Sequence, residues 1–386
     1  MAEPAGPMML AVATQDPHAI AETYVRQHMR RIAPGRTVGI GLACQGPPPD
    51  DLPFFCLPAH APGLAGRLQS LSALLRSGYA GTPTPAAEAR LGRFLEAHGV
   101  RCILAEFGPT GAALRRVCRS RGLRLFVNFH GYDATVMPRR ARIRHAYRLL
   151  ARDAEGVICG SQHFRQILIG LGFPPQKISV VPCGVDLAAF RPGRLRDRNR
   201  VIGVGRLTPK KAPDLLIRAF ARAATDRPGL RLSLIGDGPL MPRCRALVAE
   251  LGLQDRIDLL GAQPHVAIRD RLAGAGIFAQ HSLTAPNGDQ ESQGISLVEA
   301  MAAALPVVTT DHNGFSETVL HGTTGLLSPE GDVPAMAAHL AALADAPERA
   351  AALGAAGRAR AEARFDAEAL TGRLRALLLP GEEGCA

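Results

Sequence analysis

Short apolar runs alternate with amphipathic stretches along most of the chain, and this alternation constrains the fold more than any other feature. Runs such as Thr37–Leu42, Leu123–Phe129 and Arg231–Ile235 suit buried strands, and the stretches between such runs suit helices. Strands that alternate with helices form parallel sheets, because a crossover helix returns the chain to the same edge of the sheet. The sequence therefore predicts an α/β fold.

The alternation occurs twice, which predicts two doubly wound, Rossmann-like domains. A length of 386 residues also favours two domains at roughly 150 residues each. The charged, turn-rich stretch Asp186–Arg200 is the best linker candidate. We expect an N-terminal domain over 1–190, a second domain over 191–365 and a helical tail over 366–386 that crosses back to the first domain. Two such domains place a ligand cleft between the carboxyl ends of their sheets.

Within this frame the expected elements are short. The predicted strands are Met9–Ala13, Thr37–Leu42, Arg101–Ala105, Leu123–Phe129, Gly156–Cys159, Ile178–Val181, Val201–Val204, Arg231–Ile235, Ile257–Leu260, Gly276–Ala279 and Pro306–Thr309. The proline-rich stretch Gly46–Gly66 and the stretch Ser77–Pro85 are predicted as loops. The Ala/Arg-rich stretch Ala350–Leu379 is predicted to be helical, with Gly354 and Gly357 as its weak points.

Composition excludes several classes of protein. Hydrophobic residues make up 47%, which allows a large core, and aromatic residues only 4% with no Trp, which disfavours nucleic-acid binding by base stacking. No apolar run approaches the roughly 18 residues that span a bilayer, and no signal peptide is expected. None of the eight cysteines forms a C-x-x-C pair, so we expect small buried apolar side chains rather than a zinc or redox site. These features predict a soluble cytoplasmic protein.

The net charge of +11 is concentrated in the first half of the chain. Residues 1–190 hold 22 basic and 12 acidic residues, whereas residues 191–386 hold 23 and 22. Two arginine clusters stand out: Arg115, Arg116, Arg119, Arg121 and Arg124, and Arg139, Arg140, Arg142, Arg144, Arg148 and Arg152. They predict either peripheral contact with an anionic membrane or lipid-linked phosphate, or solvated helix faces, and the sequence favours neither.

Two classes of nucleotide-binding domain are disfavoured. A dinucleotide-binding domain requires G-x-G-x-x-G between a strand and a helix, and both candidates, at Gly39–Cys44 and Gly203–Thr208, lack the third glycine. The chain also contains no G-x-x-x-x-G-K-[ST] phosphate-binding loop.

The second half contains an ordered set of motifs. They are GRLTPKKAPDLLIRAF (205–220), IGDGPL (235–240), ESQGISLVEAMAAALPVVTT (291–310) and NGFSETVLHGTTGLL (313–327). With these motifs the chain resembles retaining glycosyltransferases of the family-4 type, which have the GT-B fold. HGYD (130–133) and GDQES (288–292) make it most similar to bacterial exopolysaccharide and colanic-acid transferases of glycosyltransferase group 1.

Glu291 and Glu299 are the strongest site candidates. A helix that starts near Gly294 would direct the backbone N–H groups of Gly294, Ile295 and Ser296 at an anion. The resemblance implies that Glu299 binds the donor ribose and that Glu291 contacts the donor sugar. By themselves, two glutamates at this spacing would equally fit the exposed face of an amphipathic helix.

Arg206 and Lys211 follow a predicted strand and can bracket a pyrophosphate. The resemblance assigns them to the leaving diphosphate, whereas Lys210 fits a solvated basic turn. Ala212 replaces the glycine usual after the motif lysine, which should change the turn slightly.

Three further candidates belong to the first half. His130 should emerge at the carboxyl end of the strand Leu123–Phe129, and the resemblance places such a histidine beside the transferred sugar, with Asp133 in the same turn as a donor contact. In AETYV (21–25), Glu22 is a candidate for an acceptor hydroxyl or a helix-cap carboxylate.

The resemblance implies a retaining, metal-independent hexosyltransferase that needs no cofactor. It would use a nucleotide-diphosphate sugar, with UDP first and GDP second, and a glycan or lipid-linked acceptor. A transferase for a small natural product such as an aminoglycoside, a catalytically silent sugar-nucleotide-binding subunit and a sugar-nucleotide epimerase remain the alternatives. No nucleic-acid partner is expected.

Overall fold

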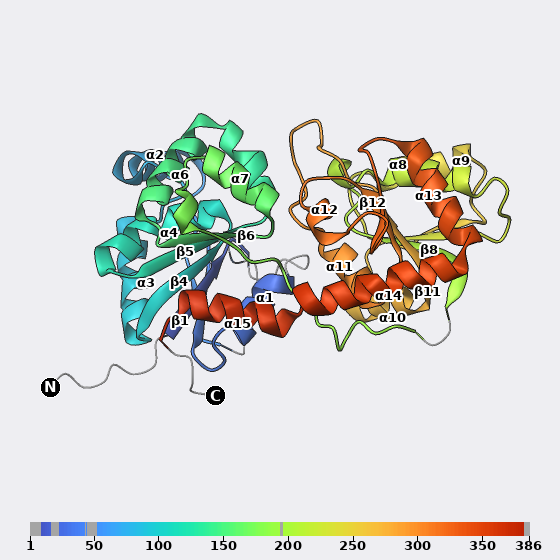
Figure 1. Cartoon of the computed structure of the whole chain (residues 1–386). Helices are drawn as coiled ribbons and strands as arrows, with labels where there is room; N and C mark the ends of the chain where they lie inside the picture. The colour runs from blue at the N-terminus through green and yellow to red at the C-terminus, as the bar shows by residue number, and fades with distance from the viewer. Residues whose placement is uncertain (1–8, 17–22, 43, 45–51, 194–195, 382–386) are drawn as a thin grey trace. The chain divides into compact units, whose positions relative to one another are not determined.

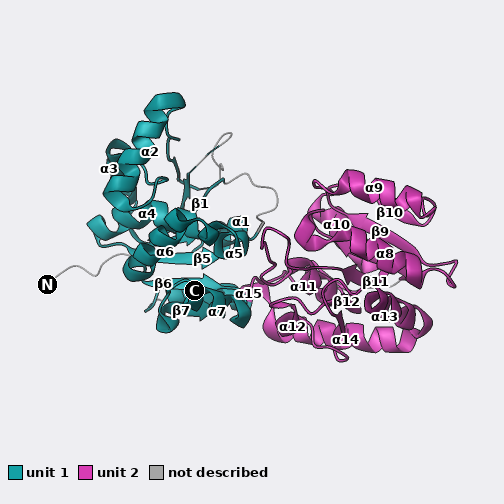
Figure 2. Cartoon of the chain, turned by 90° about the horizontal axis from the view of Figure 1, so that it is seen from above, with its two compact units in different colours: residues 1–181, 369–386 teal, residues 182–368 magenta. Residues whose placement is uncertain are grey.

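The computed structural model describes residues 9–16, 23–42, 44, 52–193 and 196–381, and they form two compact units. Unit 1 comprises Met1–Val181 with Ala369–Ala386, and unit 2 comprises Pro182–Glu368 (Figures 1 and 2). Each unit has its own parallel sheet with helices on both faces, so the predicted α/β, GT-B class is confirmed.

Unit 1 contains a seven-stranded sheet in the order β3-β2-β1-β4-β5-β6-β7. Its strands are β1 (Met9–Thr14), β2 (Thr37–Gly41), β3 (Phe54–Cys56), β4 (Val100–Glu106), β5 (Arg124–Phe129), β6 (Gly156–Cys159) and β7 (Ile178–Val180). Its helices are α1 (Thr23–Arg31), α2 (Gly63–Ser77), α3 (Pro85–Ala97), α4 (Gly108–Arg121), α5 (Tyr132–Thr135), α6 (Ala141–Asp153) and α7 (Gln162–Gly170), with the 3-10 turns η1 (Met137–Arg139) and η2 (Pro175–Lys177).

Unit 2 contains a six-stranded sheet in the order β10-β9-β8-β11-β12-β13. Its strands are β8 (Asp197–Val204), β9 (Arg231–Ile235), β10 (Ile257–Leu259), β11 (Ala275–Gln280), β12 (Val307–Thr310) and β13 (Gly325–Ser328). Its helices are η3 (Pro209–Lys211), α8 (Pro213–Ala223), α9 (Met241–Glu250), α10 (His265–Gly274), α11 (Ile295–Ala302), α12 (Phe315–Thr318), α13 (Val333–Asp345) and α14 (Pro347–Arg364), and α15 (Ala367–Leu378) follows.

Every strand pair in both sheets is parallel, and the strand order changes direction beside the first strand of each unit. In unit 1 the chain starts at β1, builds outward to β3 and returns to β4 on the other side of β1. Unit 2 repeats this with β8, β9, β10 and then β11. Loops at the carboxyl ends of strands on either side of such a switch point diverge, which opens the place where α/β sheets bind ligands.

The division between the units lies before the expected boundary at 190/191. The Val185 N–H donates to the Phe365 carbonyl (2.9 Å) and the Ala367 N–H donates to the Val185 carbonyl (3.2 Å), which ties the segment after Pro182 to unit 2. From Ala369 on, the chain belongs to unit 1, where the leucines of α15 join a buried cluster with Leu10, Val12 and Leu104 of the sheet.

Two elements occur where loops were predicted. Strand β3, only three residues long, lies within the first predicted loop. Helix α2 covers 63–77, so it takes in the last four residues of the first predicted loop and the first residue of the second. Both lie in or beside proline-rich sequence, where the prolines predicted turns and so concealed the strand and the start of the helix. In the described residues no helix has both the length and the apolar character needed to cross a bilayer.

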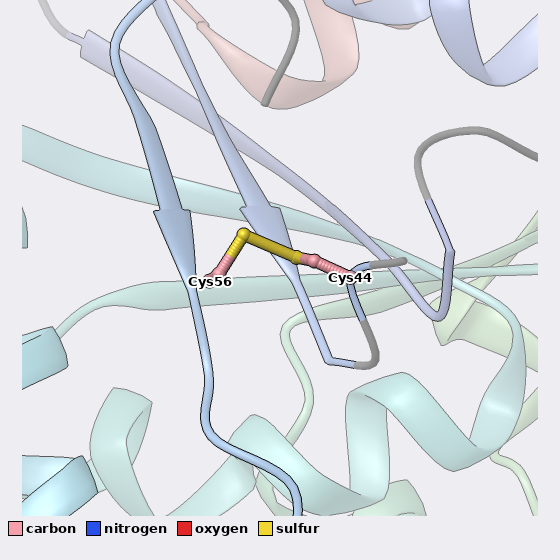
Figure 3. Close-up of a disulfide and its surroundings, with 2 residues drawn as sticks. All are labelled: Cys44 and Cys56. Carbon is pink, nitrogen blue, oxygen red and sulfur yellow. A yellow bond between two sulfur atoms is a disulfide. The ribbon is translucent and has the colours of Figure 1, made fainter. Parts of the chain in front are cut away.

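One expectation about the cysteines is wrong. Cys44, which follows β2, and Cys56, at the end of β3, form a disulfide with Cα atoms 6.0 Å apart (Figure 3). The parallel pairing of β2 with β3 brings the two residues together, and a spacing of twelve residues carries no motif that would reveal this. Cys102, Cys118, Cys159 and Cys244 are buried free thiols, as expected.

The two glycines of α14 differ in the space around them. A side chain at Gly354 would collide with the backbone carbonyl of Ala304, whereas a Cβ at Gly357 would lie 3.4 Å from the Thr324 carbonyl. We therefore expect Gly354→Ala to lower the free energy of unfolding by about 1–3 kcal/mol through overpacking, although alanine favours helix. Gly357→Ala, the matched control, should change it by less than about 1 kcal/mol. Urea unfolding checks both, and a stabilised Gly354→Ala would contradict the packing.

Candidate functional site

At the carboxyl edge of the unit 1 sheet, one buried carboxylate lies between two imidazoles. Glu106 ends β4 and His130 follows β5, and the parallel register pairs Glu106 with Asn128. Glu106 is completely buried, with Oε1 2.6 Å from His28 Nδ1 and Oε2 2.7 Å from His130 Nε2. Asn128 Nδ2 donates to Oε2 at 3.1 Å. Sequence reasoning identified His130 but missed Glu106 and His28, which lie far from each other in sequence and in no shared motif.

The charge on Glu106 determines the tautomers of its partners. Burial by itself would raise the pKa of this carboxyl, but His28 and His130 outweigh burial and lower the pKa to about 2. An ionised carboxylate only accepts hydrogen bonds, so His28 Nδ1 and His130 Nε2 each carry a proton. His130 is thereby held in one orientation by a hydrogen bond to a buried carboxylate.

Two aromatic rings confine the His130 imidazole. The ring centroids of Tyr24 and Phe107 lie 4.4 Å and 4.7 Å from that of His130. Phe107 has a φ of 71°, a left-handed conformation that bulky residues rarely adopt. Strained backbone of this kind occurs where a loop must present particular groups.

Asp133 anchors the loop that follows β5. Its Oδ1 accepts the backbone N–H groups of His130 and Gly131, both at 3.0 Å, and its Oδ2 accepts the Gly108 N–H at 2.9 Å. The residue is buried at 2% exposure. In the structure this side chain therefore fixes the position of His130, and a direct donor contact by Asp133 stays a prediction. Glu22 lies outside the described residues.

In unit 2, a partly buried carboxylate lies between two ammonium groups. Glu291 Oε1 is 3.1 Å from Lys210 Nζ, and Oε2 is 3.3 Å from Lys211 Nζ. Lys210 also pairs with Asp289 at 3.2 Å. The interpretation of Lys210 as a solvated turn residue is wrong: it is buried at 8% exposure and shares Glu291 with Lys211. Arg206 is exposed and adds positive charge near Lys211.

The electrostatics of this cluster oppose its burial. Burial would raise the pKa of Glu291, but Lys211 and Lys210 lower it to about 2. Burial also lowers the pKa of Lys211, and Glu291 opposes that effect. Lys210 and Lys211 pair with the carboxylates of Asp289 and Glu291, and the exposed Arg206 adds a further positive charge near Lys211.

Ala212, in the place of the usual glycine, ends the turn that carries these lysines. Ala212 has a φ of 35°, so alanine adopts the left-handed conformation that glycine would adopt more easily. Asn313, the first residue of the motif 313–327, likewise has a φ of 50°, a conformation that asparagine adopts more readily than most residues.

Helix α11 starts beside the lysines. Gly294 precedes it with a φ of 75°, and Ile295 and Ser296 form its first turn, where backbone N–H groups have no partner within the helix. Gln280, the last residue of β11, joins this turn to the lysines: with its amide oxygen 3.2 Å from Lys211 Nζ, its nitrogen lies 2.7 Å from Ser296 Oγ. The structure therefore brings Lys211, Glu291 and the first turn of α11 together.

Glu299 lies one turn further along α11 and is nearly buried. Its Oε1 is 3.1 Å from Nε2 of His265, the first residue of α10, and this hydrogen bond raises the pKa of His265. Sequence reasoning missed His265, which no motif includes. The ribose contact of Glu299 stays a prediction.

His312 holds the backbone of Glu291. Its Nε2 accepts the Glu291 N–H at 3.1 Å, so the ring proton lies on Nδ1, which faces Glu330. Burial lowers the pKa of His312, which keeps the ring neutral and able to accept. This support was not visible in the sequence.

No group of three or more His, Cys, Asp or Glu side chains suited to a metal ion occurs among the residues that the structure describes. Metal independence itself stays a prediction.

Comparison with known proteins identifies the family. A model of Glycosyl transferases group 1 matches residues 187–360, and a model of Glycosyltransferase Family 4 matches residues 41–189. A Mycolicibacterium smegmatis protein named GDP-mannose-dependent alpha-(1-6)-phosphatidylinositol monomannoside mannosyltransferase is 30% identical over 78% of this chain and 84% of its own length. The chain belongs to the group 1 glycosyltransferases.

Other members of this family carry names from exopolysaccharide synthesis. A Salmonella typhimurium relative named for colanic acid biosynthesis is 34% identical over 62% of this chain, and the match spans only 60% of that relative. The crystal structure of Anabaena HepE in complex with UDP is similar with a TM-score of 0.77, covering 96% of this chain and 99% of HepE at 20% identity. That likeness shows the fold of this glycosyltransferase.

The Glu106 network predicts a pH-dependent stability. Because the folded protein lowers the pKa of Glu106, its ionised form stabilises the fold above the ordinary value of 4.5, and this contribution is lost as the pH falls towards about 2. Glu106→Gln should lower the free energy of unfolding at pH 7 by about 1–3 kcal/mol, because the amide NH2 leaves one of the two imidazole N–H groups without an acceptor and the charge that strengthens both bonds is lost. The difference from wild type should shrink as the pH falls below 4.5. Urea unfolding at several pH values measures both effects.

Glu96→Gln is the matched control, since Glu96 pairs with Arg121 on the surface. It should change stability little at any pH. A Glu106→Gln protein as stable as wild type at pH 7 would contradict the network.

Proposed function

We propose that this chain is a retaining glycosyltransferase that transfers a sugar from a nucleotide-diphosphate sugar to a hydroxyl of a glycan or lipid-linked acceptor. One observation carries the proposal: Arg206 and Lys211 line one pocket with Gln280, and Gln280 joins Lys211 to Ser296 in the first turn of α11. Paired cations and helix N–H groups are the usual partners of a diphosphate.

In the reaction, the bond between the anomeric carbon and the phosphate oxygen breaks, and a bond to the acceptor oxygen forms on the same face of the sugar. The proton of the acceptor hydroxyl goes to the leaving phosphate oxygen. Lys211 and Arg206 stabilise the charge that grows on the diphosphate, which is electrostatic catalysis by groups already in place.

Glu291 and His130 position the sugar. Both oxygens of Glu291 pair with ammonium groups, and its pKa is lowered to about 2, which suits an anion that stabilises positive charge at the anomeric centre rather than a covalent nucleophile. His130 has its Nε2 proton held by Glu106, which fixes the ring for a contact with the sugar.

UDP is the first candidate for the nucleotide and GDP the second. GDP is a candidate because the relative from Mycolicibacterium smegmatis is named as GDP-mannose-dependent. An exopolysaccharide acceptor fits the relatives named for colanic acid and amylovoran biosynthesis.

We expect one nucleotide series to raise the melting temperature of the purified protein, with the same shift in EDTA. Screening UDP, GDP, ADP and their sugar conjugates by thermal shift identifies the donor. No shift with any nucleotide would contradict the donor site, and a shift lost in EDTA would contradict metal independence.

Lys211→Met and Glu299→Ala should each weaken binding of that nucleotide by about tenfold or more, because each removes a charged contact worth roughly 1.5–3 kcal/mol. Isothermal titration calorimetry measures the affinity. Arg245→Gln, an exposed cation on α9, is the control and should bind like wild type. Unchanged affinity in both site variants would overturn the site.

A further inference from the structure

Helix α2 exposes four large apolar side chains. The exposed fractions of Leu64, Leu68, Leu71 and Leu75 are 73%, 59%, 52% and 80%. They account for most of the large apolar side chains that are exposed in the described part of the chain; the others are Tyr132, Val266 and Leu320. The helix lies at the outer side of unit 1 (Figures 1 and 2). Such a concentration on one helix marks an interaction surface.

The four leucines form a single face. Their spacing of four, three and four residues places them in one row along the helix. The side chains that α2 buries are small and belong to Gly66, Ala73 and Ser77. Leu74 is half-buried, so α2 places four of its five leucines outside and buries only small residues, which reverses the usual pattern.

Two arginines of α4 and a threonine in the loop that follows α2 hold α2 in this orientation. Arg115 donates to the Ser77 carbonyl at 2.7 Å and Arg116 to the Arg76 carbonyl at 3.2 Å, which satisfies carbonyls at the end of the helix. The Ser77 hydroxyl lies 2.6 Å from Thr82 Oγ1, and a Cβ at Gly66 would collide with the Ala61 carbonyl. A roll of α2 that buried the leucines would break these contacts.

A positively charged helix, α6, packs against the C-terminal end of α2. Gly78, which ends α2, packs against His145 and Leu149 of α6. The exposed arginines of η1 and α6 are Arg139, Arg140, Arg142, Arg144, Arg148 and Arg152, and no acidic residue occurs between the first and last of them. On α2 itself, Arg67 is exposed beside the leucines and the helix contains no Asp or Glu.

The positive charge around the leucine face favours an anionic bilayer over a second copy of the chain as the partner that covers it. A second copy of the chain would bring Arg67 and the α6 arginines towards like charges, with no carboxylate on α2 to pair with them. An anionic bilayer offers hydrocarbon for the leucines and phosphate oxygens for the arginines.

We propose that unit 1 docks on an anionic lipid bilayer, with the leucine face of α2 inserted at the level of the acyl chains and the α6 arginines on the headgroup phosphates. The helix lies in the plane of the membrane, as amphipathic surface helices do. This surface goes beyond sugar transfer, and its test needs neither donor nor acceptor.

Vesicle flotation tests the proposal with the full-length protein. Wild type should bind vesicles of phosphatidylcholine with phosphatidylglycerol, and binding to pure phosphatidylcholine should be at least about tenfold weaker, because attraction to the arginines is lost. Leu68→Gln combined with Leu71→Gln should reduce partitioning onto anionic vesicles by about tenfold or more. Val266→Gln, at an apolar residue of α10 exposed by 58%, is the matched control and should bind like wild type.

The arginines are tested separately. Arg142→Gln combined with Arg148→Gln should weaken binding to anionic vesicles and flatten its salt dependence, whereas Arg218→Gln combined with Arg245→Gln in unit 2 should not. All variants should keep the wild-type melting temperature and its nucleotide-induced shift, since the substituted side chains are exposed and outside the donor site.

Three results would overturn the proposal: wild type that binds no vesicle, a leucine variant that binds like wild type, or leucine substitutions that convert a dimer to a monomer in light scattering without changing vesicle binding. The last result would assign the face to a second copy of the chain. A protein that binds vesicles but no nucleotide would leave the docking surface standing and overturn the donor site alone.

Discussion

Glu106 in unit 1 and Glu291 in unit 2 are carboxylates largely removed from water, and the cost of desolvating each charge must be offset by fixed hydrogen-bond donors and cations. Glu106 is offset by two imidazoles, and Glu291 by two ammonium groups. A buried anion whose partner is removed is strongly destabilising, so these partners cannot move freely. The positions of His130, Lys210 and Lys211 follow from this electrostatic requirement.

Hydrogen bonds to the backbone fix the loops that carry these charged side chains. Asp133 gathers three backbone N–H groups and so fixes the loop that carries His130, and His312 accepts the backbone N–H of Glu291. Groups held in this way lose little entropy when a ligand arrives, because they are ordered before it binds. Left-handed residues such as Phe107 and Ala212 are the backbone strain that accompanies this order.

The leucine face of α2 is the opposite case, because here apolar side chains are left in water. The helix places its small residues inside, where α2 packs closely, and leaves its large apolar residues in water. The free-energy cost of exposing these leucines to water is not offset within unit 1. It becomes a gain when the face meets hydrocarbon, which links the architecture of the first unit to a surface outside the protein.

The amino-acid sequence by itself determined the α/β class and the places of most strands, because alternation of apolar runs and helix-length stretches is a local signal. Strand β8 nevertheless begins at Asp197, inside the predicted linker, and β3 and β13 were not predicted. The predicted Thr37–Leu42 and Pro306–Thr309 correspond to β2 and β12, and the family of the motifs around Glu291 was readable for the same reason. Only the tertiary structure decided that Glu106 joins His28 to His130, that Lys210 is buried, that Cys44 pairs with Cys56 and that the leucines of α2 face outward. Each of these depends on which segments lie side by side, and parallel sheets bring together residues far apart in the chain without leaving a pattern in the sequence.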